Sequence, residues 1–240
     1  SGEPSGERYA KAIVRRSPIR NACRSDAVSR RSHRRPTSRG SAPKSPAVVA
    51  PASPSTRLGR TPGTGTAYLG MVVAAGGTMV LFPLFPTLQE SLGLSTGSLG
   101  LVAAAGFGAA LVTELLLAPQ ADRGHVRRMA VVALTLVALS LAASALATEA
   151  WHLVAARAVS GVGLGLYLPA AAGLLVRLAP LRAGEALGRL GTAELGGLAI
   201  GPLLASAALA WTDPGTVFAV AAVLAAVGAV VVGVRLREPV

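Results

Sequence analysis

The chain has 240 residues, of which 52% are hydrophobic and only 14% are charged, and this composition lies outside the range of ordinary soluble domains. Its formal net charge of +12 arises almost entirely in residues 1–60, which hold 14 Lys and Arg against 3 acids, whereas residues 61–240 hold 9 against 8. The basic character therefore belongs to one terminal segment and does not indicate a nucleic-acid partner for the rest of the chain.

Residues 1–60 are rich in Arg, Ser and Pro and show no sustained apolar periodicity, which predicts disorder. Three interpretations stay open: a transit peptide, a basic nucleic-acid patch at residues 30–36, and an idle extension or misassigned start. Cys23 is the single cysteine, so no intrachain disulfide can form. No cluster of His, Cys and carboxylates has metal-ligand spacing and no nucleophile–His–acid grouping is evident, so we expect no metal, no cofactor and no enzyme activity.

From residue 64 onward, long apolar runs alternate with short polar breaks. Each run is close to the roughly 20 residues that an α-helix needs to cross about 30 Å of hydrocarbon. None has the polar face that a helix of a soluble protein normally shows. The pattern predicts an all-α membrane protein with a domain over residues 64–238 and six transmembrane helices near residues 66–88, 98–118, 129–148, 151–173, 188–210 and 216–236.

Arginines divide unequally between the two sides of this topology, and Lys and Arg near helix ends are retained in the cytoplasm. The outside breaks, at residues 89–97, 149–150 and 211–215, hold none. We therefore predict a multi-pass protein of the cell (inner) membrane with both termini in the cytoplasm. The eight arginines of the inside breaks are Arg123, Arg127, Arg128, Arg177, Arg182, Arg189, Arg235 and Arg237.

Small residues four apart predict close helix contacts, because helices in lipid associate through tight packing. Pro202 removes a backbone donor next to one such stripe and is expected to bend or loosen its helix. The stripes are Gly100, Ala104 and Gly108 in the second span, Gly161 and Gly165 in the fourth, and Ala193, Gly197, Gly201 and Ala205 in the fifth.

Three ionisable residues fall inside predicted spans, where a charge costs about 3 kcal/mol or more and should face protein or water. Arg157 is the leading functional candidate, as a cavity residue that binds an anionic group or biases a carboxylate; a structural ion pair is the alternative. Glu194 can carry a proton or be structural. Glu114 lies near the predicted cytoplasmic end of its helix, which favours a surface-seeking or loop-pairing role.

Residues 64–238 resemble the amino-terminal half of a major facilitator superfamily transporter, and drug:proton antiporters in particular. The loop at residues 118–129 is similar to the family's GxxxDRxGRR signature, although Ala118 replaces the first glycine and Gly124 precedes its expected position. The fourth span matches an RxxxG pattern. The matching residues are Asp122, Arg123, Arg127 and Arg128 in the loop, Arg157 with Gly161, Gly77 with Pro83 and Pro86 in the first span, and Gly197, Gly201 and Pro202 in the fifth.

The resemblance implies two three-helix inverted repeats, which together make half of a twelve-helix fold. It implies a secondary transporter, with proton-coupled efflux of small molecules as the expected activity. Arg157 and Glu194 would serve coupling, and Asp122 with its neighbouring arginines would gate the cytoplasmic side. The expected partners are the bilayer, a small-molecule substrate, protons, and either a missing carboxy-terminal half or a second copy. The alternative is a non-transporting six-helix membrane scaffold or partner protein.

Overall fold

The computed structural model describes residues 63–121 and 125–236. The predicted disordered tail at residues 1–60 and the loop residues Asp122 and Arg123 lie outside this part of the chain. The described residues belong to one unit, Ser53–Val240. Six helical segments in it are long and apolar enough to cross a membrane.

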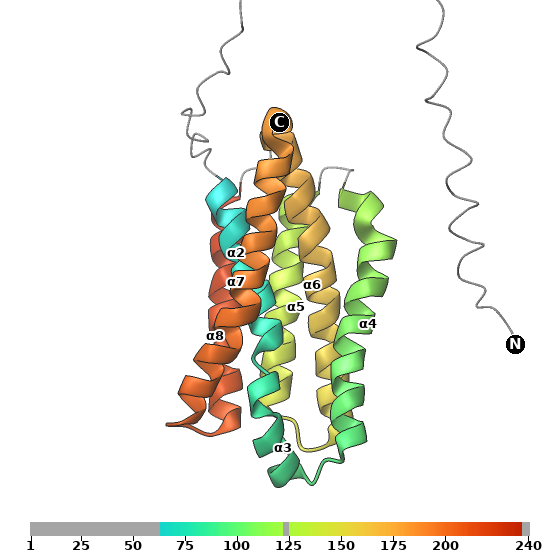
Figure 1. Cartoon of the computed structure of the whole chain (residues 1–240), viewed down its shortest axis with the longest axis vertical. Helices are drawn as coiled ribbons and strands as arrows, with labels where there is room; N and C mark the ends of the chain where they lie inside the picture. The colour runs from blue at the N-terminus through green and yellow to red at the C-terminus, as the bar shows by residue number, and fades with distance from the viewer. Residues whose placement is uncertain (1–62, 122–124, 237–240) are drawn as a thin grey trace, which may run out of the picture. The chain divides into compact units, whose positions relative to one another are not determined.

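The helices follow one another with short breaks and run in alternating directions (Figure 1). Five of the six predicted spans are single helices whose ends lie within five residues of the predicted ones. The elements are α2 (Thr64–Met79), η1 (Phe82–Leu84), α3 (Phe85–Leu92), α4 (Thr96–Ala121), α5 (Val126–Ala145), α6 (Ala150–Leu178), η2 (Pro180–Arg182), α7 (Ala183–Leu209) and α8 (Pro214–Arg235).

The first predicted span, near residues 66–88, is one membrane-spanning segment but not one helix, because α2 ends at Met79 and is followed by the 3₁₀ turn η1 and then α3. Pro83 and Pro86 account for the break, since each lacks the N–H that an α-helix needs at that position. By contrast, α7 continues without interruption through Pro202. One missing donor in a long, packed helix is tolerated, whereas two prolines three residues apart end the α-helical ladder.

The helix contacts show the predicted internal repeat. When α2 is exchanged with α6, α4 with α7, and α5 with α8, the α4–α6 interface becomes the α7–α2 interface, and α5–α6 becomes α8–α2. All four of these interfaces are present, and the α5–α8 and α2–α6 contacts map onto themselves. Because the exchanged helices run in opposite directions, the six spans form two three-helix inverted repeats.

Glycines allow the closest of these approaches. A Cβ on Gly161 would lie 2.1 Å from the carbonyl oxygen of Gly106, and a Cβ on Gly201 would lie 2.3 Å from that of Gly76. Gly165 and Gly197 meet neighbouring backbone in the same way, at 2.4 and 2.6 Å. The predicted stripes of the fourth and fifth spans are therefore packed against α4 and α2.

The stripe predicted for the second span lies on the wrong face of its helix. Gly100, Ala104 and Gly108 are exposed, and a Cβ on either glycine would meet nothing within 4 Å. The buried face of α4 instead carries Gly106 and Ala110. α4 is rich in Gly and Ala on several faces, so the spacing of four did not identify the packed one.

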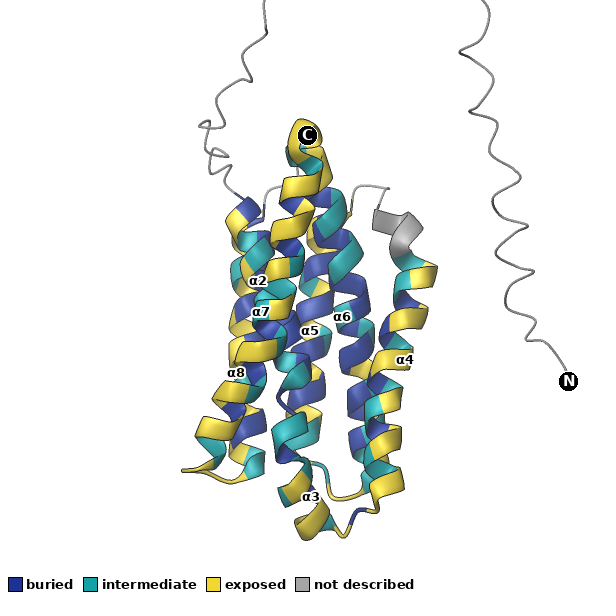
Figure 2. Cartoon of the chain, in the orientation of Figure 1, coloured by how far each residue is buried: buried dark blue, intermediate teal, exposed yellow. Residues whose placement is uncertain are grey.

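The two ends of the bundle differ in charge. Of the seven arginines in the described residues, six lie at the end where α5 begins, and Arg157 is the exception. Outward faces along the helices are largely exposed, whereas buried residues form the interior (Figure 2). The exposed side chains include Leu115 and Val234, which are 70% and 73% exposed, as expected for faces that contact lipid.

Candidate functional site

Arg157 is buried inside the membrane domain, with a relative exposure of 5%. It lies in the second turn of α6, about 10 Å from the helix start at 1.5 Å per residue. Its Nη1 donates to the backbone carbonyl of Thr78 and to the hydroxyl of Ser160, the latter at 3.1 Å. A guanidinium in a membrane interior therefore obtains its partners from backbone and hydroxyl oxygens.

The break in the first span explains why the Thr78 carbonyl can accept this bond. The last four carbonyls of an α-helix have no intrahelical partner. Thr78 is the penultimate residue of α2, and its own hydroxyl donates to the Ala75 carbonyl at 2.8 Å. The prolines that follow thus create, by ending α2, an acceptor at the depth of Arg157.

Two aromatic rings cover the guanidinium. Its Cζ lies 5.4 Å from the ring centroid of Phe82 and 5.8 Å from that of Phe107. Phe85 extends the cluster, with its ring centroid 5.3 Å from that of Phe82. Cation–π contacts of this kind contribute about 0.5–2 kcal/mol each, more when the site is dry. Three of the four phenylalanines in the chain therefore gather around one buried cation.

Gly106 provides the space that the Arg157 side chain occupies. A Cβ at residue 106 would lie 2.7 Å from Nε and 2.9 Å from Cγ of the arginine. The backbone of the same glycine also packs against Gly161, which lies one turn further along α6. One residue of α4 therefore permits both the helix contact and the placement of the guanidinium.

Arg157 has no ion-pair partner within the described part of the chain, so the structural ion pair weighed from the sequence is not observed there. Its Nε is buried and makes no hydrogen bond in this structure. An unpaired buried donor costs about 1–3 kcal/mol. The aromatic cluster and Gly106 of α4 contact the side chain and leave it only 5% exposed.

Glu194 and Glu114 lie elsewhere in the bundle, on α7 and α4. Each is half-buried. α4 continues to Ala121, so Glu114 is about 10 Å from the helix end, farther than the sequence suggested. Both carboxylates thus lie within membrane-spanning segments, and Glu114 does not lie beside a loop.

The predicted gating residues are only partly within the described chain. Arg127 and Arg128 occupy the first turn of α5, and both are exposed. The side chain of Ala118 and the positions of Asp122, Arg123 and Gly124 lie outside the described residues. Between residues 63 and 236, apart from that gap, no group of three or more His, Cys, Asp or Glu side chains could hold a metal ion.

Sequence reasoning missed the surroundings of Arg157. Thr78, Phe82 and Phe107 are 79, 75 and 50 residues away in the chain and carry no motif. The spacing of four between Gly106 and Ala110 also predicts a packed face, but the stripe of Gly100, Ala104 and Gly108 has the same spacing, so the sequence does not choose between them. Ser160 could also have been found from its i+3 spacing to Arg157, at which side chains on a helix meet.

Six membrane-spanning helices in two inverted repeats, with a buried arginine between the fourth, first and second spans, define a multi-pass membrane protein of the kind that forms half of a transporter fold. The sequence of residues 67–240 matches the family model of the Major Facilitator Superfamily, and the chain belongs to that family. It is 27% identical over 164 residues to the "Multi-drug resistance efflux pump PmrA homolog" of Lactococcus lactis subsp. lactis (strain IL1403). That match covers 66% of this chain and 40% of the relative's length.

Proposed function

We propose that the chain forms one half of a secondary transporter that exports small amphipathic molecules in exchange for protons. The observation that carries this proposal is the family membership, joined with a buried arginine in the fourth span that has no ion-pair partner among the described residues. The similarity to a protein named as a multidrug efflux pump supports export as the direction. In the same proposal the chain lies in the cell membrane with both termini in the cytoplasm. The arginines gathered at one end of the bundle support this orientation.

The carboxylates of Glu114 and Glu194 support the proposal that this chain associates with a second half or a second copy. A charge that faces hydrocarbon costs about 3 kcal/mol on insertion scales. Glu114 and Glu194 are half-exposed within their spans, so the surfaces that carry them fit poorly against lipid. A face covered by another six-helix unit, or lining a water-filled cavity between two units, accommodates both carboxylates.

In this proposal Glu194 binds a proton from the external side and releases it to the cytoplasm while the substrate moves outward. Arg157 supplies the fixed positive charge. Its buried Nε–H has no acceptor in this structure, and the rings of Phe82 and Phe107 lie over its cation. In the proposed cycle an anionic group takes the place of these rings when the site opens. Arg127 and Arg128, with Asp122 and Arg123, would gate the cytoplasmic end.

The test is dye efflux from cells that express the complete reading frame encoding this chain, with the proton gradient intact or collapsed by an ionophore. We expect efflux to stop when the gradient is collapsed, and Glu194→Gln to export far more slowly while Glu90→Gln, in an exposed external segment, exports normally. Unchanged efflux without a gradient would contradict coupling. Absence of efflux from correctly inserted protein under every condition would favour the scaffold alternative.

A further inference from the structure

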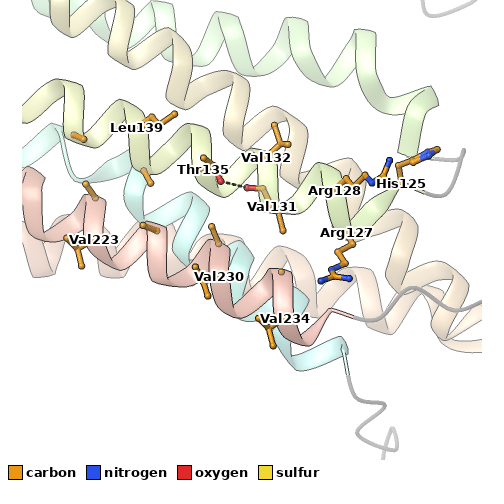
Figure 3. A pocket seen from close by; sticks show the side chains of 16 residues that line it. His125, Arg127, Arg128, Val131, Val132, Thr135, Leu139, Val223, Val230 and Val234 are labelled. Atoms are coloured by element: carbon orange, nitrogen blue, oxygen red, sulfur yellow. Dashed lines mark hydrogen bonds between the residues drawn. The ribbon is translucent and has the colours of Figure 1, made fainter.

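A long groove runs along the surface of the bundle between α5 and α8, with a volume of about 1410 Å³ (Figure 3). Ala138 and Ala222 are buried at its floor, and larger apolar side chains such as Leu139 and Val230 form its walls. Thr135 is the one polar residue along this apolar length, and its hydroxyl is bonded to the Val131 carbonyl at 2.8 Å. The groove therefore offers an apolar ligand a continuous surface without an unpaired polar group.

One end of the groove is strongly basic. His125, Arg127 and Arg128 line it there, and none of the described residues that line the groove is acidic (Figure 3). The same end is the amino terminus of α5, which has no acidic residue in its first turn and no side-chain cap. The helix dipole thus adds to the two guanidinium groups in favouring a negative charge.

The dimensions of the groove match one lipid leaflet. Its apolar lining on α5 extends from Val131 to Ala142, a rise of about 17 Å at 1.5 Å per residue. Half of a hydrocarbon core about 30 Å thick is about 15 Å. A ligand that follows the groove therefore has its head at the level of the arginines and its tail near the middle of the membrane.

We propose that this groove binds an anionic glycerophospholipid, with the phosphate at Arg127 and Arg128 and one acyl chain lying between α5 and α8. The basic end accounts for the charge of the headgroup, and the apolar length accounts for the chain. A soluble anion would bind the basic end only and would leave the apolar length of the groove unoccupied. The site shares Arg127 and Arg128 with the proposed cytoplasmic gate but does not involve Arg157 or Glu194, and lipid binding can be measured whether or not the chain exports anything.

The experiment measures lipid bound to the purified full chain in a neutral detergent by native mass spectrometry, using phosphatidylglycerol and phosphatidylcholine with identical acyl chains. Each basic residue near a membrane surface contributes about fivefold to the binding of an anionic lipid, so the pair predicts about a thirtyfold preference for phosphatidylglycerol. Arg127→Ala/Arg128→Ala should lose most of this preference, and Arg127→Lys/Arg128→Lys should keep it. The control Arg182→Ala/Arg189→Ala removes two arginines from the same end, outside the groove, and should bind like the wild type.

Ala226→Trp tests the acyl part without altering charge, since Ala226 is exposed and lines the groove. Ala226→Trp should weaken the binding of both lipids severalfold. This result remains informative if the double alanine variant does not fold. Equal binding of the two lipids by the wild type would overturn the proposal, as would an unchanged preference in Arg127→Ala/Arg128→Ala. Binding of glycerol phosphate as tight as that of the lipid, or full binding to Ala226→Trp, would overturn it too.

Discussion

Replacing Gly161 by alanine should weaken the membrane domain far more than the same change at Gly108. A Cβ at residue 161 would sit 2.1 Å from the backbone oxygen of Gly106, and real Cβ atoms essentially never approach closer than 3.0 Å. The α4 and α6 backbones would therefore have to separate by about 0.9 Å or more. At residue 108, on the exposed face of α4, an added Cβ meets nothing within 4 Å.

The magnitude follows from comparing the two variants. Both gain the same helix propensity, about 1 kcal/mol for glycine to alanine, so this term cancels in the difference. Overpacking costs about 1–3 kcal/mol. The atom that a Cβ at residue 161 would meet belongs to the backbone, which cannot move away by changing rotamer. We therefore expect a loss of stability at the upper end of that range, about 3 kcal/mol. The separation would also withdraw Gly106 from Arg157, so Gly161→Ala should lose function as well as stability.

The assay is thermal unfolding of the purified domain in detergent, followed by circular dichroism at one protein concentration for the wild type, Gly161→Ala and Gly108→Ala. Gly108→Ala should melt at or slightly above the wild-type temperature, and Gly161→Ala clearly below it. Equal melting temperatures for the two variants would refute the reasoning that the α4–α6 contact depends on glycine at residue 161.

Two further predictions concern side chains that make hydrogen bonds. Tyr167 is buried and donates to the Ala67 carbonyl at 2.9 Å, so Tyr167→Phe should cost about 1 kcal/mol of stability in the same melting assay, and unchanged melting would show that the bond contributes nothing. Asp213 caps α8 by accepting from the backbone and hydroxyl of Thr216, and these bonds hold the pKa of Asp213 below its usual value. Its stabilising effect should therefore be complete above about pH 4, near the pKa of an unfolded aspartate, and decline as the pH falls further. The melting difference between wild type and Asp213→Ala should shrink over that acid range, and a difference that stays constant would contradict this origin.

The six spans could be predicted because a membrane imposes a length and an apolar composition that are visible in the sequence. The interruption after Met79 could have been predicted as well, since Pro83 and Pro86 both remove donors from the same helical ladder. The sequence nevertheless predicts one span there, because the apolar run continues without a long polar break to about residue 88. A membrane requires apolar side chains whether the helix is continuous or broken, so the apolar run alone does not reveal the break.

The packed face of α4 could not be predicted, because Gly and Ala occur on several of its faces. The stripe of Gly100 and Gly108 satisfies the spacing of four as well as Gly106 and Ala110 do. Only the position of α6 decides between them, and that position is a property of the whole bundle. α7 is also rich in Gly and Ala, yet there the predicted stripe, with Gly197 and Gly201, is the packed one.

The importance of Arg157 could be predicted from the cost of a charge in a membrane, but its environment could not. Its acceptor is the backbone carbonyl of Thr78, which is available because a helix ends there. Every residue has such a carbonyl, so the sequence does not indicate which one accepts the bond. Phe82 and Phe107 come from two other segments and meet only in the folded bundle. Long-range contacts of this kind require the arrangement of helices to be known first.

The most direct test of coupling through the fourth span is proton-driven dye efflux by Arg157→Ala, made in the complete reading frame and compared with Arg189→Ala. Arg189 is exposed and paired with Glu185 at 2.8 Å, so it controls for the loss of an arginine without touching the buried site. Membrane protein levels are measured for both variants. We predict that Arg157→Ala is present at a normal level but exports no dye, whereas Arg189→Ala exports normally. Normal gradient-dependent efflux by Arg157→Ala would contradict the role assigned to this residue.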